Sequence, residues 1–525
     1  MRLKVVLIQI DLIMGSRVLL SLLREQGCDV KSLQINIRYM DLFSPEDLNI
    51  IFGYVDGAEV VGLSFNTFYA RAAKQLALFL KQKGVKYIIT GGNHATALPE
   101  EALVYSDIVV RFEAEITFPQ LLKALEKGKK TSHIKGIVYK RDGSIIDTGS
   151  PDIIWELDKL PFQCIDTGII KFFTPKKKIF TPQKKELFPI KENSYFILAS
   201  RGCPFSCTYC SNSLYYSIDK NFKRVRKRSI GNILAEMEYA QNAGFTSFYI
   251  ADDHFFSFYL EEIELFGRLY KNKIGKPFIV GGINPNDFRS PSAEKKLKLL
   301  LDSGLSDIRV GVQSGSNKTL EIFKRGYKAE DIPKLLEPIE RNRDTVWGAP
   351  YNKLHVSLDF ICDALWEDEE DKIATIRLAQ KVLKQYSIFF YTLVYLPGTE
   401  IFNLALKQGW IKDKEKDIYL RGIAGVDDNI YNRLLFLIAI TKERSVTLSE
   451  ELIGHVLRIS HWDERLAKDI IDSFIKRIHE VELHNKVNLT HAAFHPYLTG
   501  YNTWTKTTGD VGRKVLFRSY HEPYG

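Results

Sequence analysis

The chain has 525 residues and a formal net charge of +9, and 45% of its residues are hydrophobic and 26% charged. This composition is typical of a soluble globular protein, and the length predicts two to four domains. The longest uninterrupted apolar run, Leu434 to Ile440, is far too short to cross a bilayer. The sequence therefore predicts no membrane-spanning helix.

The first predicted element is a strand. The stretch MRLKVVLIQID is apolar up to Asp11 and contains no cleavage-like site, which favours a β-strand over a signal peptide. We therefore expect a cytoplasmic protein, in which clustered cysteines more often form a metal or catalytic site than a disulfide framework.

Residues 1–127 alternate between strand-like and helix-like stretches. The predicted strands are LKVVLIQI, DVKSLQINI, AEVVGLSFN, KYIITGG and DIVVRF. Five strands separated by helices predict a doubly wound, flavodoxin-like parallel sheet. The stretch GIVYKRDGSIIDTG follows as a hairpin with Asp142-Gly143 as its turn, so we expect the first domain to span residues 1–150.

Polar and small residues follow three of these strands. Ligands of doubly wound sheets bind beyond the carboxyl ends of the strands. The residues there are Ser64, Asn66 and Thr67 after the third strand, Gly91, Gly92, Asn93 and His94 after the fourth, and Glu113 and Glu115 after the fifth. Paired glycines let a backbone approach a ligand closely, although the Gly-Gly pair by itself favours a plain structural turn.

A Lys- and Pro-rich connector, residues 151–194, leads to a second alternation of strands and helices over residues 195–411. The predicted strands are YFILAS, SFYIADDHF, PFIVGGINP, DIRVGVQSG, KLHVSLDFI and IFFYTLVYLPG. Six β/α units predict an open or partial (β/α)6 barrel with its site at the carboxyl ends of the strands.

Three of the six cysteines, Cys203, Cys207 and Cys210, are spaced C-x3-C-x2-C directly after the first barrel strand. Three thiolates can hold a cubane iron–sulfur cluster and leave one iron open to a small ligand. Structural zinc normally needs four closed ligands, and His254 is a weak candidate for the fourth. The remaining cysteines are isolated and are expected to be buried apolar residues.

The cysteine loop resembles the radical S-adenosylmethionine (SAM) signature, with Tyr209 as its aromatic residue. This resemblance implies a [4Fe–4S] cluster whose open iron chelates SAM, and electron transfer that cleaves SAM to a 5′-deoxyadenosyl radical. It also implies SAM contacts further along the barrel. The matching residues are Asp252 and Asp253 after the second strand, Gln313 and Ser314 in GVQSGS, and Tyr395 in VYLPGTE.

The stretches VVGLSFNT, IITGGNHATALPEEAL and DIVVRFEAEITFPQLL resemble, in this order, the cobalamin-binding domain of one radical SAM subgroup. The resemblance implies that the polar and small residues at the strand ends bind cobalamin. Where the subgroup has G-E-G-E, this chain has Phe112-Glu113-Ala114-Glu115 and lacks both glycines. Ile13 occupies the position of the cobalt-ligating histidine in other cobalamin proteins, so we expect no histidine ligand from this loop.

The barrel departs from the subgroup after its fifth strand. The subgroup has G-x-P-G-E-T where this chain has Cys362-Asp363-Ala364-Leu365-Trp366-Glu367. Loss of Gly and Pro changes the turn, and we expect the loop to shape a distinctive substrate pocket. Residues 412–525 are predicted to be a mostly helical domain that ends in an aromatic tail.

Two short runs, KNFKRVRKRS (220–229) and TPKKKIFTPQKK (174–185), supply much of the positive charge. Nucleic-acid binding is one interpretation, because phosphate contacts need Lys and Arg. A solvated linker or helix entrance is the more common role of runs this short.

The resemblance implies a cobalamin-dependent radical SAM C-methyltransferase, which uses a [4Fe–4S] cluster, SAM and methylcobalamin and an electron donor such as flavodoxin or ferredoxin. The expected substrate is a peptide or protein side chain or a small metabolite. A cobalamin-dependent radical SAM cyclase or rearrangement enzyme remains the alternative within the family. A metal-stabilised nucleic-acid-binding module is the alternative from another class.

Overall fold

The computed structural model describes residues 3–11, 14–188, 193–344, 354–382, 386–421, 426–443, 448–484 and 517–518. By their internal contacts these residues form two compact units. The first unit contains the described parts of Met1–Phe248 and Val394–Gly422. The second unit contains the described parts of Tyr249–Leu393, Ile423–Leu498 and Lys506–Gly525.

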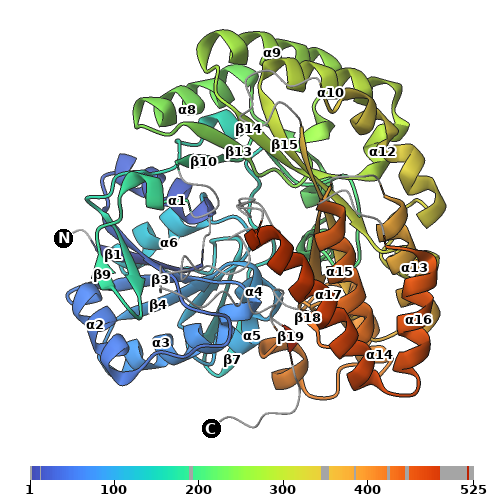
Figure 1. The fold of residues 1–525 in the computed structure, drawn as a ribbon. Helices are drawn as coiled ribbons and strands as arrows, with labels where there is room; N and C mark the ends of the chain where they lie inside the picture. Colours follow the sequence, from blue (N-terminus) through green and yellow to red (C-terminus); the bar gives the residue numbers. More distant parts are fainter. Residues whose placement is uncertain are drawn as a thin grey trace. The chain divides into compact units, whose positions relative to one another are not determined.

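A nine-stranded sheet with the strand order β7-β6-β5-β4-β3-β1-β2-β8-β9 organises the first unit (Figure 1). Its strands are β1 (Lys4–Ile10), β2 (Asp29–Ile35), β3 (Val60–Ser64), β4 (Tyr87–Gly91), β5 (Ile108–Val110), β6 (Ile137–Arg141), β7 (Ser144–Asp147), β8 (Ile170–Thr174) and β9 (Lys178–Phe180). Strands β1 to β5 are parallel. Their order confirms the predicted flavodoxin-like sheet.

Helices cover both faces of this sheet, as a doubly wound fold requires. Figure 1 shows α1 (Met14–Glu25) and α6 (Thr117–Glu126) on one face and α2 (Pro45–Val55) and α3 (Ala70–Gln82) on the other. Apolar residues of α2 and α3 pack on β1 to β4 in one buried core. Strand ends at the carboxyl edge lead into α4 (Asn93–Ala97) and α5 (Pro99–Ala102).

Two antiparallel pairs flank the parallel strands. The β6–β7 hairpin turns at Asp142 and Gly143, whose φ values are 49° and 78°, so the predicted hairpin is confirmed. Strands β8 and β9 lie in the segment predicted as a connector, and β8 pairs with β2. Part of that segment therefore extends the sheet.

The second sheet has the strand order β10-β13-β14-β15-β16-β17, as expected for a partial barrel of six strands. These strands are β10 (Ser194–Ile197), β13 (Ser247–Ile250), β14 (Phe278–Ile283), β15 (Leu305–Gln313), β16 (His355–Cys362) and β17 (Ser387–Thr392). The intervening helices include α8 (Ile230–Asn242), α9 (Leu260–Lys273), α10 (Pro291–Ser303), α11 (Asn317–Ile322), α12 (Ile332–Asn342) and α13 (Glu369–Lys381). Strands β14 to β17 are parallel, so their carboxyl ends share one edge.

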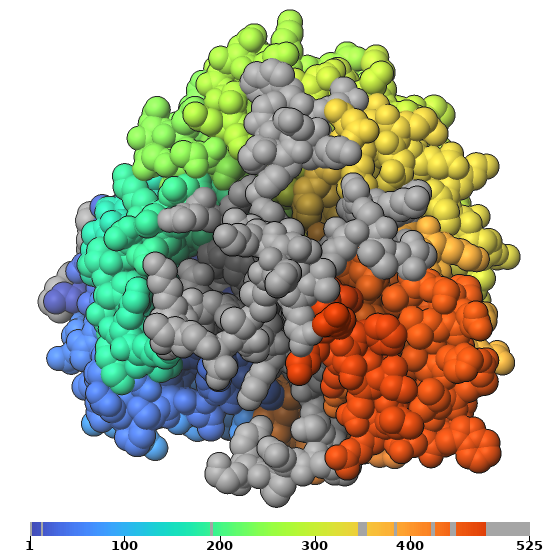
Figure 2. Space-filling view, viewed as in Figure 1, coloured from blue at the N-terminus to red at the C-terminus, as the bar shows by residue number. Residues whose placement is uncertain are grey.

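The described part of residues 412–525 is largely helical, as predicted. Helices α15 (Ile430–Glu443), α16 (Glu450–Ser460) and α17 (Glu464–His484) contact one another and form the orange-to-red surface in Figure 2. Most of the aromatic tail lies outside the described residues, apart from β19 (Phe517–Arg518), which pairs with β18 (Val426–Asp427). No helix among the described residues is long and apolar enough to span a bilayer.

Candidate functional site

The cysteine loop leaves a short antiparallel ribbon formed by β11 (Ser200–Arg201) and β12 (Arg226–Lys227). The Tyr216 hydroxyl accepts a hydrogen bond from the Cys203 amide at 3.2 Å and donates one to the Cys203 carbonyl at 2.6 Å. The Cys210 amide donates to the Cys207 carbonyl at 3.2 Å, and Cys210 caps α7 (Ser211–Ile218). Hydrogen bonds to backbone groups of Cys203 and Cys207 thus hold the loop in its conformation.

Gly202 fixes how the loop begins. Its φ is 93°, and a Cβ at this position would lie 2.9 Å from the Arg224 carbonyl oxygen and 3.1 Å from that of Phe222. A side chain would clash with the backbone and strain the conformation. The segment after α7 therefore packs directly against the residue that precedes Cys203.

The donor set suits an iron–sulfur cluster. None of the three cysteines forms a disulfide, and Cys207 is buried while Cys203 and Cys210 are half-buried. Within the described ranges no group of three or more His, Cys, Asp or Glu side chains is close enough together to hold a single metal ion, so the structure shows no preformed zinc-type site. Three thiols from one loop match the chemistry of a cluster with one open iron. His254, the candidate zinc ligand, instead pairs with Asp287 at 2.7 Å.

Two predicted cobalamin residues, Glu113 and Glu115, bind arginines of the β11–β12 ribbon. Arg201 contacts Glu115 at 2.6 Å and Glu113 at 3.2 Å, and Arg226 contacts Glu113 at 2.9 Å. Burial opposes ionisation of Glu113, but Arg226 and Arg201 outweigh it and lower the pKa of that carboxyl. Burial likewise lowers the pKa of Arg201, and attraction to Glu115 and Glu113 raises it overall. The network joins the β5 loop to the cysteine loop.

Aromatic residues reinforce this junction. Phe112, at a position where the subgroup has glycine, has a φ of 61° and stacks on Phe222 with ring centroids 4.7 Å apart. It also contacts Tyr215, whose hydroxyl donates to the Asn93 side-chain oxygen. The missing glycine is therefore replaced by a packing contact with the segment that follows the cysteines.

The glycine pair after β4 meets the chain's own backbone. Gly92 has a φ of 91°, and a Cβ there would lie 2.5 Å from the Phe65 carbonyl oxygen. A Cβ on Gly91 would lie 3.3 Å from the Val110 carbonyl oxygen. Gly92 is thus required by the turn itself, and its proximity to Ser64 keeps the carboxyl ends of β3 and β4 close together.

The other predicted cobalamin residues have partners within the first unit. Asn66 donates to Asp11 at 3.2 Å, and Thr67 contacts the buried His94 ring at 3.3 Å. His94 also lies 3.7 Å from Glu101 and against the Tyr419 ring, and its Nε2 has no hydrogen-bond partner. The same Nε2 lies within ion-pair distance of the Glu101 carboxylate and the His94 ring is fully buried, so residues of this unit hold the ring in place. Ile13 lies outside the described residues.

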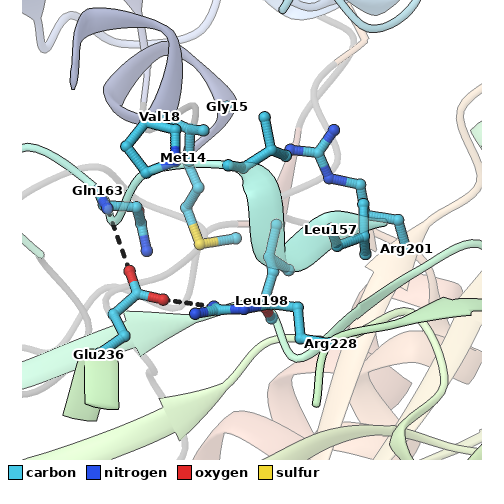
Figure 3. Close-up of a pocket in the computed structure, with 11 residues that line it drawn as sticks. Met14, Gly15, Val18, Leu157, Gln163, Leu198, Arg201, Arg228 and Glu236 are labelled. Atoms are coloured by element: carbon cyan, nitrogen blue, oxygen red, sulfur yellow. Dashed lines mark hydrogen bonds and ion pairs between the residues drawn. The ribbon is translucent and has the colours of Figure 1, made fainter. Parts of the chain in front are cut away.

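A small cavity lies beside Arg201 in the first unit (Figure 3). Its volume is about 40 Å³, which is room for water but not for a cofactor. Glu236 accepts from the Gln163 amide at 3.1 Å and binds Arg228 on the same wall. The Gln163 side-chain oxygen is buried without a partner, so it can accept a hydrogen bond from water.

The SAM candidates Asp252, Asp253, Gln313 and Ser314 belong to the second unit, whereas Tyr209 and the buried Tyr395 belong to the first. Asp252 is buried and Asp253 is exposed after β13, and neither caps a described helix. A Cβ on Gly282 would lie 2.4 Å from the Asp252 carbonyl oxygen, so this glycine allows β14 to approach the acids.

Gln313 and Ser314 end β15. Gln313 has a φ of 75°, a strained value for a residue other than glycine. Ser314 is fully buried and lies 3.2 Å from the Thr375 hydroxyl, and it accepts a hydrogen bond from the Ser316 amide. Strained residues are often held at functional sites, and the SAM-binding role of Gln313 stays a prediction.

The unusual loop after β16 is tied to α11. Thr319 donates to Glu367 at 2.9 Å and accepts from the Trp366 indole at 3.0 Å. Burial raises the pKa of the Glu367 carboxyl to about 7, and the acids Asp371 and Asp363 add to this effect. The loop thus holds a carboxyl group that changes charge near neutral pH.

Sequence reasoning missed Arg201, Arg226, Tyr216 and Phe222. A detectable signal was present, because the acids Glu113 and Glu115 have the same two-residue spacing as inward-facing residues of an extended segment. Two arginines flanking the cysteine loop supply the opposite charge. The pairing itself depends on the fold.

The Radical SAM superfamily model matches residues 197–343. An uncharacterized methyltransferase of Pyrococcus horikoshii is 27% identical over 365 residues, which cover 67% of this chain and 72% of that protein. The structure of the radical SAM methyltransferase TsrM from Kitasatospora setae aligns with a TM-score of 0.57 at 15% identity, covering 77% of this chain and 75% of TsrM. The cobalamin-dependent SAM radical enzyme OxsB aligns with a TM-score of 0.59 at 15% identity, covering 94% of this chain and 77% of OxsB. Residues 197–343 therefore resemble the Radical SAM superfamily, and the chain shares the overall fold of TsrM and OxsB.

Proposed function

We propose that the chain is a cobalamin-dependent radical SAM methyltransferase that methylates an unactivated carbon of a peptide or protein side chain or a small metabolite. The main support is the junction between the cysteine loop and the carboxyl edge of the first sheet. Glu113 and Glu115 follow β5, and they bind Arg201 and Arg226 on either side of the cysteines. A cluster on this loop and a cofactor on this edge would be neighbours within one unit.

The proposal assigns each predicted residue a cofactor. Cys203, Cys207 and Cys210 hold the [4Fe–4S] cluster. SAM is bound by Tyr209, Asp252, Asp253, Gln313, Ser314 and Tyr395, and cobalamin by Ser64, Asn66, Thr67, Gly91, Gly92, Asn93, His94, Glu113 and Glu115. When bound, the cluster supplies the electron that cleaves SAM, and cobalamin supplies the methyl group.

The chain's own residues orient these groups. Tyr216 fixes Cys203 from both sides of its peptide unit, and the ion pairs of Arg201 hold the loop against the sheet. Because Glu113 and Glu115 already bind arginine, their proposed role is indirect: their ion pairs hold the loop after β5, and so the edge of the sheet that would bind cobalamin, in position. The names of the Pyrococcus relative and of TsrM agree with methyl transfer.

An external electron donor, such as flavodoxin or ferredoxin, belongs to the proposal, because a radical SAM cluster must be reduced before it acts. The proposed location is the cytoplasm, where a reducing environment keeps cysteines out of disulfides.

Methyl-deuterated SAM tests the reaction type. The chain, loaded anaerobically with cluster and cobalamin, should transfer the label to product and form deoxyadenosine and S-adenosylhomocysteine in comparable amounts. C203A/C207A/C210A is the matched control and should lose both its iron and all SAM cleavage. Deoxyadenosine without label or S-adenosylhomocysteine would reject methyl transfer and favour the cyclase. Iron retained in the triple variant would reject the cluster assignment.

A further inference from the structure

The segment after α7 presents an exposed basic surface that the proposed chemistry does not use. Lys220, Lys223 and Arg224 are exposed, and the Arg224 guanidinium lies 5.3 Å from the ring centre of Trp155, which is 47% exposed. We call these four residues the basic surface. None of its three cations has a carboxylate within ion-pair distance in the described structure.

Neighbouring cations of the same run are already neutralised. Arg226 binds Glu113, and Arg228 binds Glu236. Lys220, Lys223 and Arg224 therefore carry exposed charges. Arg226 and Arg228, by contrast, form ion pairs inside the first unit. Asp219 is the nearby acid, and its side chain caps the short helix η4 (Lys220–Lys223) by accepting from the Asn221 amide.

The basic surface shares its backbone with the wall of the cysteine loop. The carbonyl oxygen of Arg224 lies 2.9 Å from where a Cβ of Gly202 would be, and Gly202 directly precedes Cys203. Arg201 and Arg226 pair across the β11–β12 ribbon. Tyr216, one turn before η4, holds the Cys203 peptide. A partner seated on the basic surface would thus be separated from the cysteine loop by a single layer of chain.

We propose that the basic surface docks a small acidic electron-transfer protein that reduces the cluster held by Cys203, Cys207 and Cys210. The inference rests on the proposed function, since it requires that cluster. In each encounter the partner loses one electron and the cluster gains one, and no atom is transferred. An exposed Trp–Arg contact surrounded by unpaired cations provides both the aromatic anchor and the steering charge of a transient interface.

A nucleic-acid partner fits this surface less well. Three free cations neutralise few phosphates, whereas nucleic-acid affinity grows with the number of phosphate contacts. A protein electron donor needs only a small, charged and short-lived interface, and its need to approach the cysteines explains why the cations lie beside Gly202.

The test compares reduction by a protein with reduction by a small molecule. The full chain, with reconstituted cluster, is mixed with a reduced acidic flavodoxin or with dithionite, and cluster bleaching is followed by stopped flow. K220E/K223E/R224E should slow reduction by flavodoxin about tenfold or more at low salt, while iron content and the dithionite rate stay unchanged. Added salt should slow the native chain and leave the variant nearly unaffected.

K127E/K129E/K130E is the matched control, because it makes the same charge change at exposed lysines that directly follow α6. That helix runs from the carboxyl edge of the sheet back toward its amino edge, away from the cysteine loop. The control should reduce at the native rate. Binding of oxidised flavodoxin, measured by calorimetry without SAM or cobalamin, should weaken only in K220E/K223E/R224E.

The outcomes separate the two proposals. Equal slowing in both triple variants, or unchanged flavodoxin binding in K220E/K223E/R224E, would overturn the docking surface and leave the cluster intact. A chain that binds no iron would instead overturn the proposed function. Salt-dependent binding of an oligonucleotide that is lost in K220E/K223E/R224E, with no flavodoxin binding, would assign the surface to nucleic acid.

Discussion

The loop after β5 and the loop after β16 both lie at the carboxyl end of a parallel strand, and both lack glycines that the family pattern has. Their carboxylates are in opposite environments. Glu113 faces Arg201 and Arg226, which lower its pKa, whereas desolvation of the half-buried Glu367, with Asp371 and Asp363 nearby, raises its pKa to about 7. The same residue type is thus held ionised at neutral pH in one loop and changes charge near neutral pH in the other.

The difference teaches that a lost glycine can be compensated in two ways. After β5, Phe112 fills the space by stacking on Phe222, and the acids join the loop to another segment through charge. After β16, Trp366 and Glu367 tie their loop to Thr319 through neutral hydrogen-bond donors. The charge of Glu113 therefore stays constant above the acid range, whereas the charge of Glu367 changes with pH near neutrality.

Arg201→Met would break the charged junction and give the largest expected effect. The buried Glu115 would lose its arginine and the half-buried Glu113 would lose one of two, and breaking a buried pair typically costs about 3–5 kcal/mol of the free energy of unfolding. Urea unfolding at neutral pH measures this loss. Arg24→Met, which removes the exposed Arg24–Asp166 pair, is the control and should cost less than about 1 kcal/mol. Similar losses in both variants would contradict a structural role for the junction.

Glu367→Gln tests the contrast between the two loops through the pH dependence of the free energy of unfolding. A carboxyl whose folded pKa is about 7 and whose ordinary value is 4.5 binds more protons when folded. It therefore lowers the free energy of unfolding progressively as pH rises from about 4.5 to 7, by about 3 kcal/mol above that range. The variant should therefore unfold at higher urea than the native chain above pH 7, with no advantage below pH 4.5.

Glu113→Gln is the opposite control for that experiment. The lowered pKa of Glu113 stabilises the fold above its ordinary value of 4.5, and this contribution disappears as pH falls through the folded pKa. The control should consequently lose stability at neutral pH. Parallel pH profiles for the two glutamine variants would show that the environments do not differ.

Phe112→Gly and Phe112→Ala would give the smallest effect. Both remove the stacking on Phe222, but only alanine keeps a Cβ at a φ of 61°. Glycine should therefore be the more stable of the two by about 1 kcal/mol. Thermal unfolding of the pair measures the difference, and an alanine variant of equal or greater stability would show that the backbone there is unstrained.

Periodicity and motif order were sufficient to predict much of the fold. Alternating strands and helices identified the flavodoxin-like sheet, the Asp142-Gly143 hairpin and the six barrel strands, because each depends on local pattern. Strands β8 and β9 were not predicted, since strands of five and three residues in a Lys- and Pro-rich segment are too short to show a clear alternation. The pairing of β8 with β2 is a tertiary contact that local sequence does not encode.

The site was predicted unevenly for the same reason. The spacing of Cys203, Cys207 and Cys210 is a local signal, and it identified the cysteine loop. The partners of Glu113 and Glu115 lie about ninety residues or more away in sequence, so only the fold reveals them. Gly92 shows a second limit, because a glycine needed for its own chain's turn has the same sequence signal as one needed by a ligand.

The antiparallel strands at the two ends of the first sheet affect how copies of this chain behave in concentrated solution. Exposed parallel strands would offer unpaired backbone groups to another molecule and promote aggregation. Here the sheet ends in β7, with four residues, and β9, with three. Lys178 of β9, at a φ of 55°, binds Asp47 at 2.9 Å, so this border is bent and charged. Such short borders give a neighbouring chain little to pair with and protect the protein against edge-to-edge association during folding.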